Sequence, residues 1–155
     1  MIHLEPKQIS DLWQVDGSLR DVYAKQMTMD RWEAFLSLAL RVEYRYTSDG
    51  EPATAPDART IFGDRNHSHL LTLLIAGAQI NCHFFTESEL ELDIDPGEVL
   101  AANAHAAVLR FLETVGAAIQ LPLSITPENF QSSPYLSYES EGAGWTWYDA
   151  NSSAK

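Results

Sequence analysis

The sequence predicts an α+β protein, with a mainly antiparallel sheet and two amphipathic helices packed on one of its faces. The length of 155 residues suits one domain. Short strand-like runs are joined by tight turns, which is typical of antiparallel sheets. Only two segments repeat apolar residues at helical spacing, too few for the crossovers of a parallel sheet. We therefore expect a single domain over residues 1–150 and a frayed polar tail over 151–155.

The first expected element is a β-hairpin. Asp16-Gly17 separates two strand-like runs, residues 12–15 and 19–26, and Asp-Gly supplies the positive φ angles of a two-residue turn. A helix should then start at Thr28, whose hydroxyl can cap it. Its apolar stripe follows helical spacing at Trp32, Phe35, Leu36 and Ala39. A strand over residues 41–47 and an exposed Pro-bearing loop over 51–57 complete the first part.

The most sheet-like region follows and predicts an antiparallel meander over residues 70–76, 79–85 and 89–95. In its last run, Leu90, Leu92 and Ile94 alternate with acidic residues, so the aliphatic side chains should be core. A second helix should begin with Asp95 as its cap, Pro96 at its first position and Glu98 completing a capping box. Strands are expected over 121–126, 135–140 and 145–148.

Acidity is the strongest feature of the composition. The formal net charge is −12, and the residues after Arg65 hold 11 of the 22 acidic side chains but only 2 of the 10 basic ones. Such a chain repels phosphate backbones, so we expect no nucleic-acid ligand and favour a basic protein partner. No segment reads as a membrane span or an export signal, and the single Cys82 precludes an internal disulfide. The expected compartment is the cytoplasm.

Two groups of residues predict a protein interface. The acidic row of Glu89, Glu91, Asp93 and Asp95 should line one face of a strand, where it would meet basic side chains or remain a solvated face or edge. Near the C-terminus, large amphipathic side chains lie among carboxylates, and such side chains are common in interface hot spots. The aromatic members of this second group are Tyr138, Trp145, Trp147 and Tyr148. Packing in the core is their alternative role.

A histidine and cysteine cluster is the alternative candidate site. His67 and His69 precede one strand, and Cys82-His83 ends the next, so cross-strand pairing would bring His69 near His83. Imidazole and thiolate are the usual zinc ligands, so a small metal-binding protein or hydrolase is the alternative function. No H-E-x-x-H, C-x-x-C, G-x-S-x-G or phosphate-loop motif accompanies these residues. We therefore expect no catalytic site, metal or cofactor, and treat the cluster as the second hypothesis.

Two blocks of sequence, residues 80–86 with the acidic strand after them and residues 125–129, resemble segments of small bacterial proteins. In size, acidity and α+β pattern, the whole chain resembles bacterial immunity proteins. This resemblance implies a protein that binds and neutralises a basic cognate toxin, such as a nuclease. A self-associating module that pairs through a sheet edge is a third hypothesis.

Overall fold

The structure, a computed structural model, describes residues 4–99, 101–142 and 144–148. The predicted tail, 151–155, lies outside these residues. The helices are α1 (Pro6–Leu12), α2 (Met29–Ala39), α3 (Ala58–Gly63) and α4 (Ala102–Ile119), with a 3-10 turn η1 (Pro96–Glu98). The strands are β1 (Arg20–Lys25), β2 (Glu43–Ser48), β3 (Glu51–Pro52), β4 (His69–Ile75), β5 (Ala78–Cys82), β6 (Glu89–Ile94), β7 (Leu123–Pro127), β8 (Leu136–Glu139) and β9 (Gly144–Trp147).

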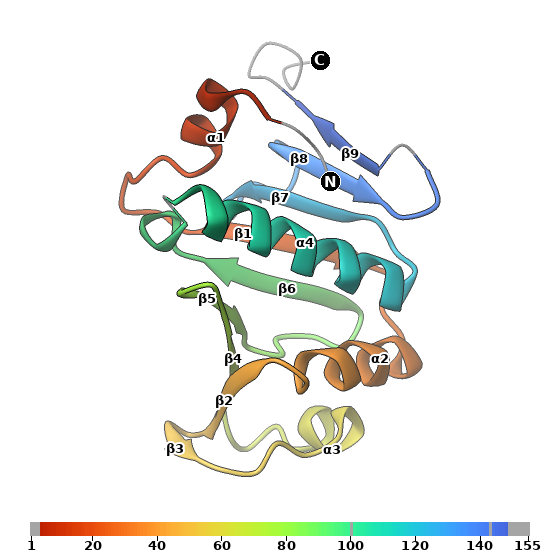
Figure 1. Cartoon of the computed structure of the whole chain (residues 1–155). Helices are drawn as coiled ribbons and strands as arrows, with labels where there is room; N and C mark the ends of the chain where they lie inside the picture. Colours follow the sequence, from red (N-terminus) through yellow and green to blue (C-terminus); the bar gives the residue numbers. More distant parts are fainter. Residues whose placement is uncertain (1–3, 100, 143, 149–155) are drawn as a thin grey trace.

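All nine strands form one antiparallel sheet, which confirms the α+β class. Their order is β3-β2-β4-β5-β6-β1-β7-β8-β9, so the first strand lies between the predicted meander and the C-terminal strands. The meander β4-β5-β6 has the antiparallel pairing expected from the sequence. The three late strands were predicted as strands, and the structure pairs them as β7-β8-β9. Helices α2 and α4 lie on one face of the sheet, and α4 runs along β1 and β6 (Figure 1).

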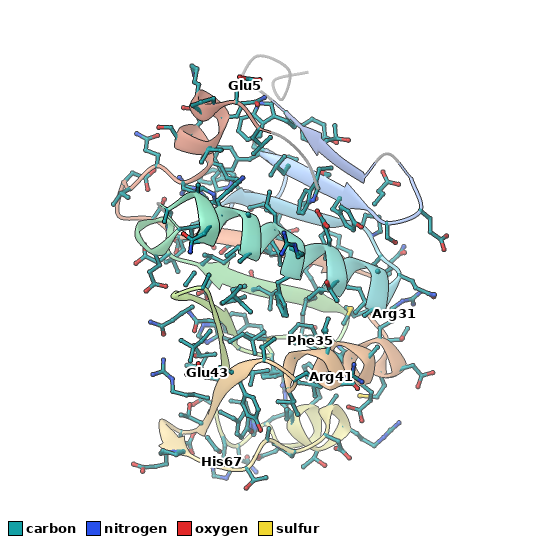
Figure 2. All side chains as sticks on the ribbon, in the orientation of Figure 1. Glu5, Arg31, Phe35, Arg41, Glu43 and His67 are labelled. Atoms are coloured by element: carbon teal, nitrogen blue, oxygen red, sulfur yellow. The ribbon has the colours of Figure 1, made fainter. Side chains whose placement is uncertain are left out.

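The core lies between this helical layer and the sheet. Leu90, Leu92 and Ile94 are buried, as their alternation with acidic residues predicted. On α2, Thr28 is the N-cap, and its side chain accepts a hydrogen bond from the backbone N–H of Arg31. The guanidinium Nε of Arg31 donates to the carbonyl of Ile119, 2.8 Å away, and so ties α2 to the end of α4 (Figure 2).

An aromatic cluster joins α2, α3 and the end of β5. The indole of Trp32 is fully buried, with its ring centroid 4.9 Å from that of Phe62 and 5.6 Å from that of Phe84. Phe35 packs edge-on against the same indole. Sequence periodicity identified Trp32 and Phe35, but the six-residue helix α3 was not predicted. Its N-cap is Asp57, whose carboxylate accepts from the N–H of Thr60 at 2.8 Å.

The predicted N-terminal hairpin is wrong. Residues 6–12 form α1, and β1 pairs with β6 and β7 instead of with residues 12–15. The buried guanidinium of Arg20 donates to the carbonyls of Leu12, Gln14 and Leu19 at 2.6, 3.0 and 3.2 Å. These carbonyls are therefore satisfied by a side chain, and the segment before β1 does not need a strand ladder.

The predicted start of the long helix is also wrong. Asp95 caps only the short turn η1, by accepting a hydrogen bond from the N–H of Gly97, and α4 begins at Ala102. The carboxylate of Glu98 does not close a capping box, because it accepts from the backbone N–H of Gln79 at 2.8 Å. A contact with β5, distant in sequence, thus overrides the local capping pattern.

Stability should fall as the pH drops from 7 to 5, because His105 is buried as a neutral ring. Its Nδ1 accepts a hydrogen bond from the indole N–H of Trp13 at 2.8 Å, and burial lowers the pKa of His105. A group with a lowered pKa stabilises the fold above its unfolded pKa, and that stabilisation is lost as pH falls through the folded pKa. Chemical denaturation should show the His105→Gln variant losing less stability over this range, by at most about 1.4 kcal/mol per pH unit. Parallel curves would contradict this role.

Among the described residues, none of the helices has the length and apolar character needed to cross a membrane.

Candidate protein-binding face

The sheet has a second face, opposite the helices, which we call the open face. Alternation along the strands turns toward it the side chains that do not enter the core. It carries six carboxylates against two basic groups: Asp21, Glu43, Glu89, Glu91, Asp93 and Glu139 against Lys25 and Arg45. Glu89, Glu91 and Asp93 of the predicted acidic row are on this face, whereas Asp95 follows β6 and caps η1. Because β6 is an internal strand, these carboxylates do not protect a sheet edge.

Asp93 lies at the centre of a hydrogen-bonded row across the open face. Its Oδ1 accepts from the amide Nδ2 of Asn81 at 2.9 Å, and its Oδ2 lies 3.2 Å from Nε2 of His83. Thr72 extends the row by donating its hydroxyl to Oδ1 of Asn81 at 2.8 Å. These contacts hold the Asp93 carboxylate in one orientation and leave it partly accessible, with 16% of its side chain exposed.

Asp21 is the register partner of Asp93 on β1, and it is only 5% exposed. Its Oδ2 accepts from the hydroxyl of Tyr23 at 3.1 Å and from the backbone N–H of Asn129 at 2.9 Å. Burial raises the pKa of Asp21, and the carboxylates of Glu128 and Asp93 raise it further. No Lys or Arg forms an ion pair with Asp21 in the described part of the chain. In the described residues, these two neighbouring carboxylates therefore have no Lys or Arg partner, and Asp93 has only His83 as an ion-pair partner.

The loop over residues 128–134 is fastened to the open face at three points. The carboxylate of Glu128 accepts from the N–H of Leu19 at 2.8 Å, and the N–H of Asn129 donates to Asp21. The amide of Gln131 donates to the carboxylate of Glu89 at 3.4 Å. Beside this loop is a hollow of about 320 Å³, lined by Tyr23, Lys25, Gln26, Pro122, Ser124 and Gln131.

Asp21, Glu89, Glu91 and Asp93 form the acidic centre of the open face, and two phenylalanines are exposed at its margins. Phe85 is 61% exposed and stacks on the ring of His83, with centroids 5.0 Å apart. Phe130 is 63% exposed and lies between the two loop residues that bind Asp21 and Glu89. The acidic groups that the sequence identified are therefore accompanied by aromatic side chains that it did not. The alternation of Asp21, Tyr23 and Lys25 with buried Val22 and Ala24 was the signal that could have identified β1 as part of the face.

The predicted aromatic group is not on the same surface as the acidic row. Tyr138 packs toward α4, where a Cβ on Gly116 would lie 2.9 Å from its ring. Trp145 donates its indole N–H to the carboxylate of Glu113 on α4 at 2.8 Å, and Trp147 stacks with Tyr135. These side chains therefore lie on the helical side of the sheet, where they pack against α4 and the core.

Tyr148 is the last member of the predicted aromatic group. It is half-buried, and its backbone N–H donates to the carbonyl of Tyr135 at 2.8 Å. Because the acidic row and the Trp145–Trp147 strand face lie on opposite sides of the sheet, one flat interface cannot use all eight predicted residues.

The histidine and cysteine residues do not converge. His67 pairs with the carboxylate of exposed Asp49, while His69 turns to the helical side, where it contacts the hydroxyl of Tyr46 and the carboxylate of Asp64. Cys82 also faces the core, and burial raises its pKa to about 12. His83 alone faces the open side, with Asp93. The expected approach of His69 to His83 fails because strand alternation places them on opposite faces, and the described residues contain no group of three or more ligands placed to hold a metal.

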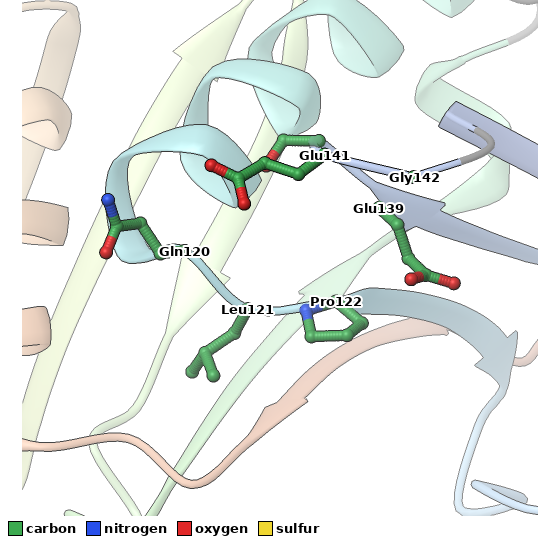
Figure 3. A pocket seen from close by; sticks show the side chains of 7 residues that line it. Gln120, Leu121, Pro122, Glu139, Glu141 and Gly142 are labelled. Atoms are coloured by element: carbon green, nitrogen blue, oxygen red, sulfur yellow. The ribbon is translucent and has the colours of Figure 1, made fainter.

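A smaller hollow of about 200 Å³ lies between the end of α4 and the β8–β9 turn. Gln120 and Leu121 form one side of it, and the segment over residues 139–142 forms the other. Figure 3 shows the carboxylates of Glu139 and Glu141 pointing to different sides. The hollow therefore lacks the converging polar groups of a ligand site.

The open face, with its carboxylate row and two exposed phenylalanines, is the strongest candidate for a functional surface. Comparisons with models of protein families, with curated proteins and with solved structures found nothing that matches this chain.

Proposed function

We propose that this chain is an acidic protein-binding module of the immunity type, which binds a basic toxin domain on its open face and so neutralises it. The observation that carries the proposal is the excess of carboxylates on a sheet face that no helix of the described residues covers. Positive and negative surfaces attract over a Debye length, so such a face speeds the approach of a basic partner. We place this activity in the cytoplasm.

The position and hydrogen bonds of two carboxylates, Asp21 and Asp93, support a role in binding a basic partner. Asp21 and Asp93 are held side by side, although burial and their mutual repulsion disfavour the charged form of Asp21. A basic side chain brought by a partner would offset this repulsion. The hydrogen bonds to Asn81 and His83 fix the Asp93 carboxylate before binding, so little ordering remains to oppose association.

The test is the association of this protein with the product of the adjacent gene. We expect the association rate to fall steeply as salt rises, because salt screens the charges that steer the encounter. The double variant Glu89→Gln with Glu91→Gln should weaken binding about tenfold or more. Asp93 is left unchanged, since its carboxylate also holds Asn81 and His83.

A matched control removes the same charge elsewhere. Glu51 and Glu141 are exposed and lie outside the acidic centre, so Glu51→Gln with Glu141→Gln should leave affinity nearly unchanged. Equal loss in both double variants would assign the effect to net charge alone. Association at the same rate in low and high salt would refute the acidic docking face.

A further inference from the structure

We propose that Phe85 and Phe130 are the aromatic anchors of the open face and that the partner meets each of them with an arginine side chain. The inference rests on the function proposed above and names the chemistry of the partner at two points. Both rings are more than 60% exposed, although large apolar side chains elsewhere in the described chain are mostly buried. Aromatic side chains in such positions are typical of interface hot spots.

Phe85 is held in place by its neighbours, with part of its ring free to stack on a partner side chain. Its ring lies nearly parallel to that of His83, at an interplanar angle of 11°, and His83 in turn contacts the carboxylate of Asp93 at 3.2 Å. The backbone carbonyl of Phe85 accepts from Nη2 of Arg65 at 2.9 Å, which fixes the end of this segment. One side of the ring is therefore covered by imidazole, and the rest faces solvent near a carboxylate.

Phe130 has a comparable setting on the other margin. Its neighbours in the chain fasten it to the sheet, because the N–H of Asn129 donates to Asp21 and the side chain of Gln131 donates to Glu89. The hollow of about 320 Å³ next to Gln131 leaves room beside the loop for a long side chain. Lys25, which lines this hollow, is the register partner of Glu89 but forms no ion pair in the described residues.

Arginine fits both settings better than lysine. A guanidinium is planar and weakly hydrated, so it can stack on a phenyl ring while its N–H groups bind a carboxylate. Each phenylalanine adjoins a residue that contacts a carboxylate: Phe85 stacks on His83, which contacts Asp93, and Phe130 precedes Gln131, which donates to Glu89. A lysine ammonium gains the charge attraction but little of the stacking, since it is compact and strongly hydrated. The face should therefore distinguish the two cations.

Two peptides of equal charge provide the test, hexa-arginine amide and hexa-lysine amide, titrated at low salt and followed by backbone amide chemical shifts. We expect hexa-arginine to bind about tenfold more tightly and to shift amides around Phe85 and in the 128–134 loop. Replacing both rings, by Phe85→Leu and Phe130→Leu, should bring hexa-arginine down to the affinity of hexa-lysine. Leucine keeps an apolar side chain at each position but has no aromatic ring. The loss of hexa-arginine affinity in this variant therefore measures the contribution of stacking.

Controls separate this inference from the function on which it rests. Val15→Ala, at another exposed apolar position, should leave both affinities unchanged. Glu89→Gln with Glu91→Gln should weaken binding of both peptides, because it removes two negative charges from the open face. If both peptides bind the open face equally well and the leucine variant changes neither, the arginine anchors are refuted and the acidic face stands. If neither peptide shifts any open-face amide, both proposals fail.

Discussion

Replacing Arg20 by methionine should lower the free energy of unfolding by about 3 kcal/mol or more. The guanidinium is only 1% exposed, and its N–H groups satisfy the carbonyls of Leu12, Gln14 and Leu19. It also lies over the ring of Tyr135, 5.2 Å from the centroid. Methionine keeps much of the apolar stem but leaves the buried carbonyl of Leu12 and the part-buried carbonyls of Gln14 and Leu19 without this donor. A buried acceptor left without a donor costs about 1–3 kcal/mol. Urea denaturation followed by tryptophan fluorescence would measure the change.

Arg45→Met is the control for this substitution. Arg45 is exposed and its single hydrogen bond is to the side chain of Gln79, so its loss should change stability by less than about 0.5 kcal/mol. Arg20→Lys should remain destabilised, because an ammonium cannot reach carbonyls spread around a planar fork. A similar cost for Arg20→Met and Arg45→Met would show that the buried network adds nothing to stability.

Trp32→Ala should cost about 3–5 kcal/mol, a large part of the stability of an ordinary domain. The indole contacts Phe35, Phe62 and Phe84, so its removal leaves a cavity where α2, α3 and the end of β5 meet. Its N–H also donates to the carbonyl of Glu87 at 2.7 Å. Thermal or chemical unfolding would measure the loss.

Two further variants separate the causes in this cluster. Trp32→Phe retains an aromatic ring but leaves the Glu87 carbonyl without its donor, so it should cost less than Trp32→Ala. Phe130→Ala removes an aromatic side chain of which 63% is exposed, and we expect a change below about 0.5 kcal/mol. If Trp32→Ala were as mild as Phe130→Ala, the aromatic cluster would not be a centre of stability.

Sequence patterns predicted the elements whose cause is local or periodic. The alternation in β6 fixed which of its faces is core, and the Thr28 cap with the stripe through Trp32 placed α2. The N-terminal hairpin failed because Arg20 supplies the hydrogen bonds that a strand partner would have given. The start of α4 failed because Glu98 binds Gln79 on another element. Local sequence patterns do not show contacts of this kind, which depend on how the elements are arranged in the fold.

Only part of the candidate site was predicted, again because local sequence patterns do not show which strands pair. The row of Glu89, Glu91 and Asp93 was readable from its spacing of two residues, whereas its neighbour Asp21 reaches it only through the pairing of β1 with β6. Tryptophans near the C-terminus were favoured as anchors by residue type, but the register of β9 turns them to the helical side. Phe85 and Phe130 carry no sequence pattern, and only their exposure in the fold reveals them.

The central position of β1 has a consequence for how the chain is made. Its ladder partners are residues 89–94 on one side and 124–127 on the other, so the ribosome must release both stretches before β1 is paired on both sides. Until then the side chains of Val22 and Ala24, which are buried in the folded protein, remain exposed to solvent. Because the central strand pairs only with residues far along the chain, we expect folding to be slow for a chain of this length. A nascent chain that ends before β7 would leave one edge of β1 without a hydrogen-bonded partner. We expect chaperones to bind the chain at that stage.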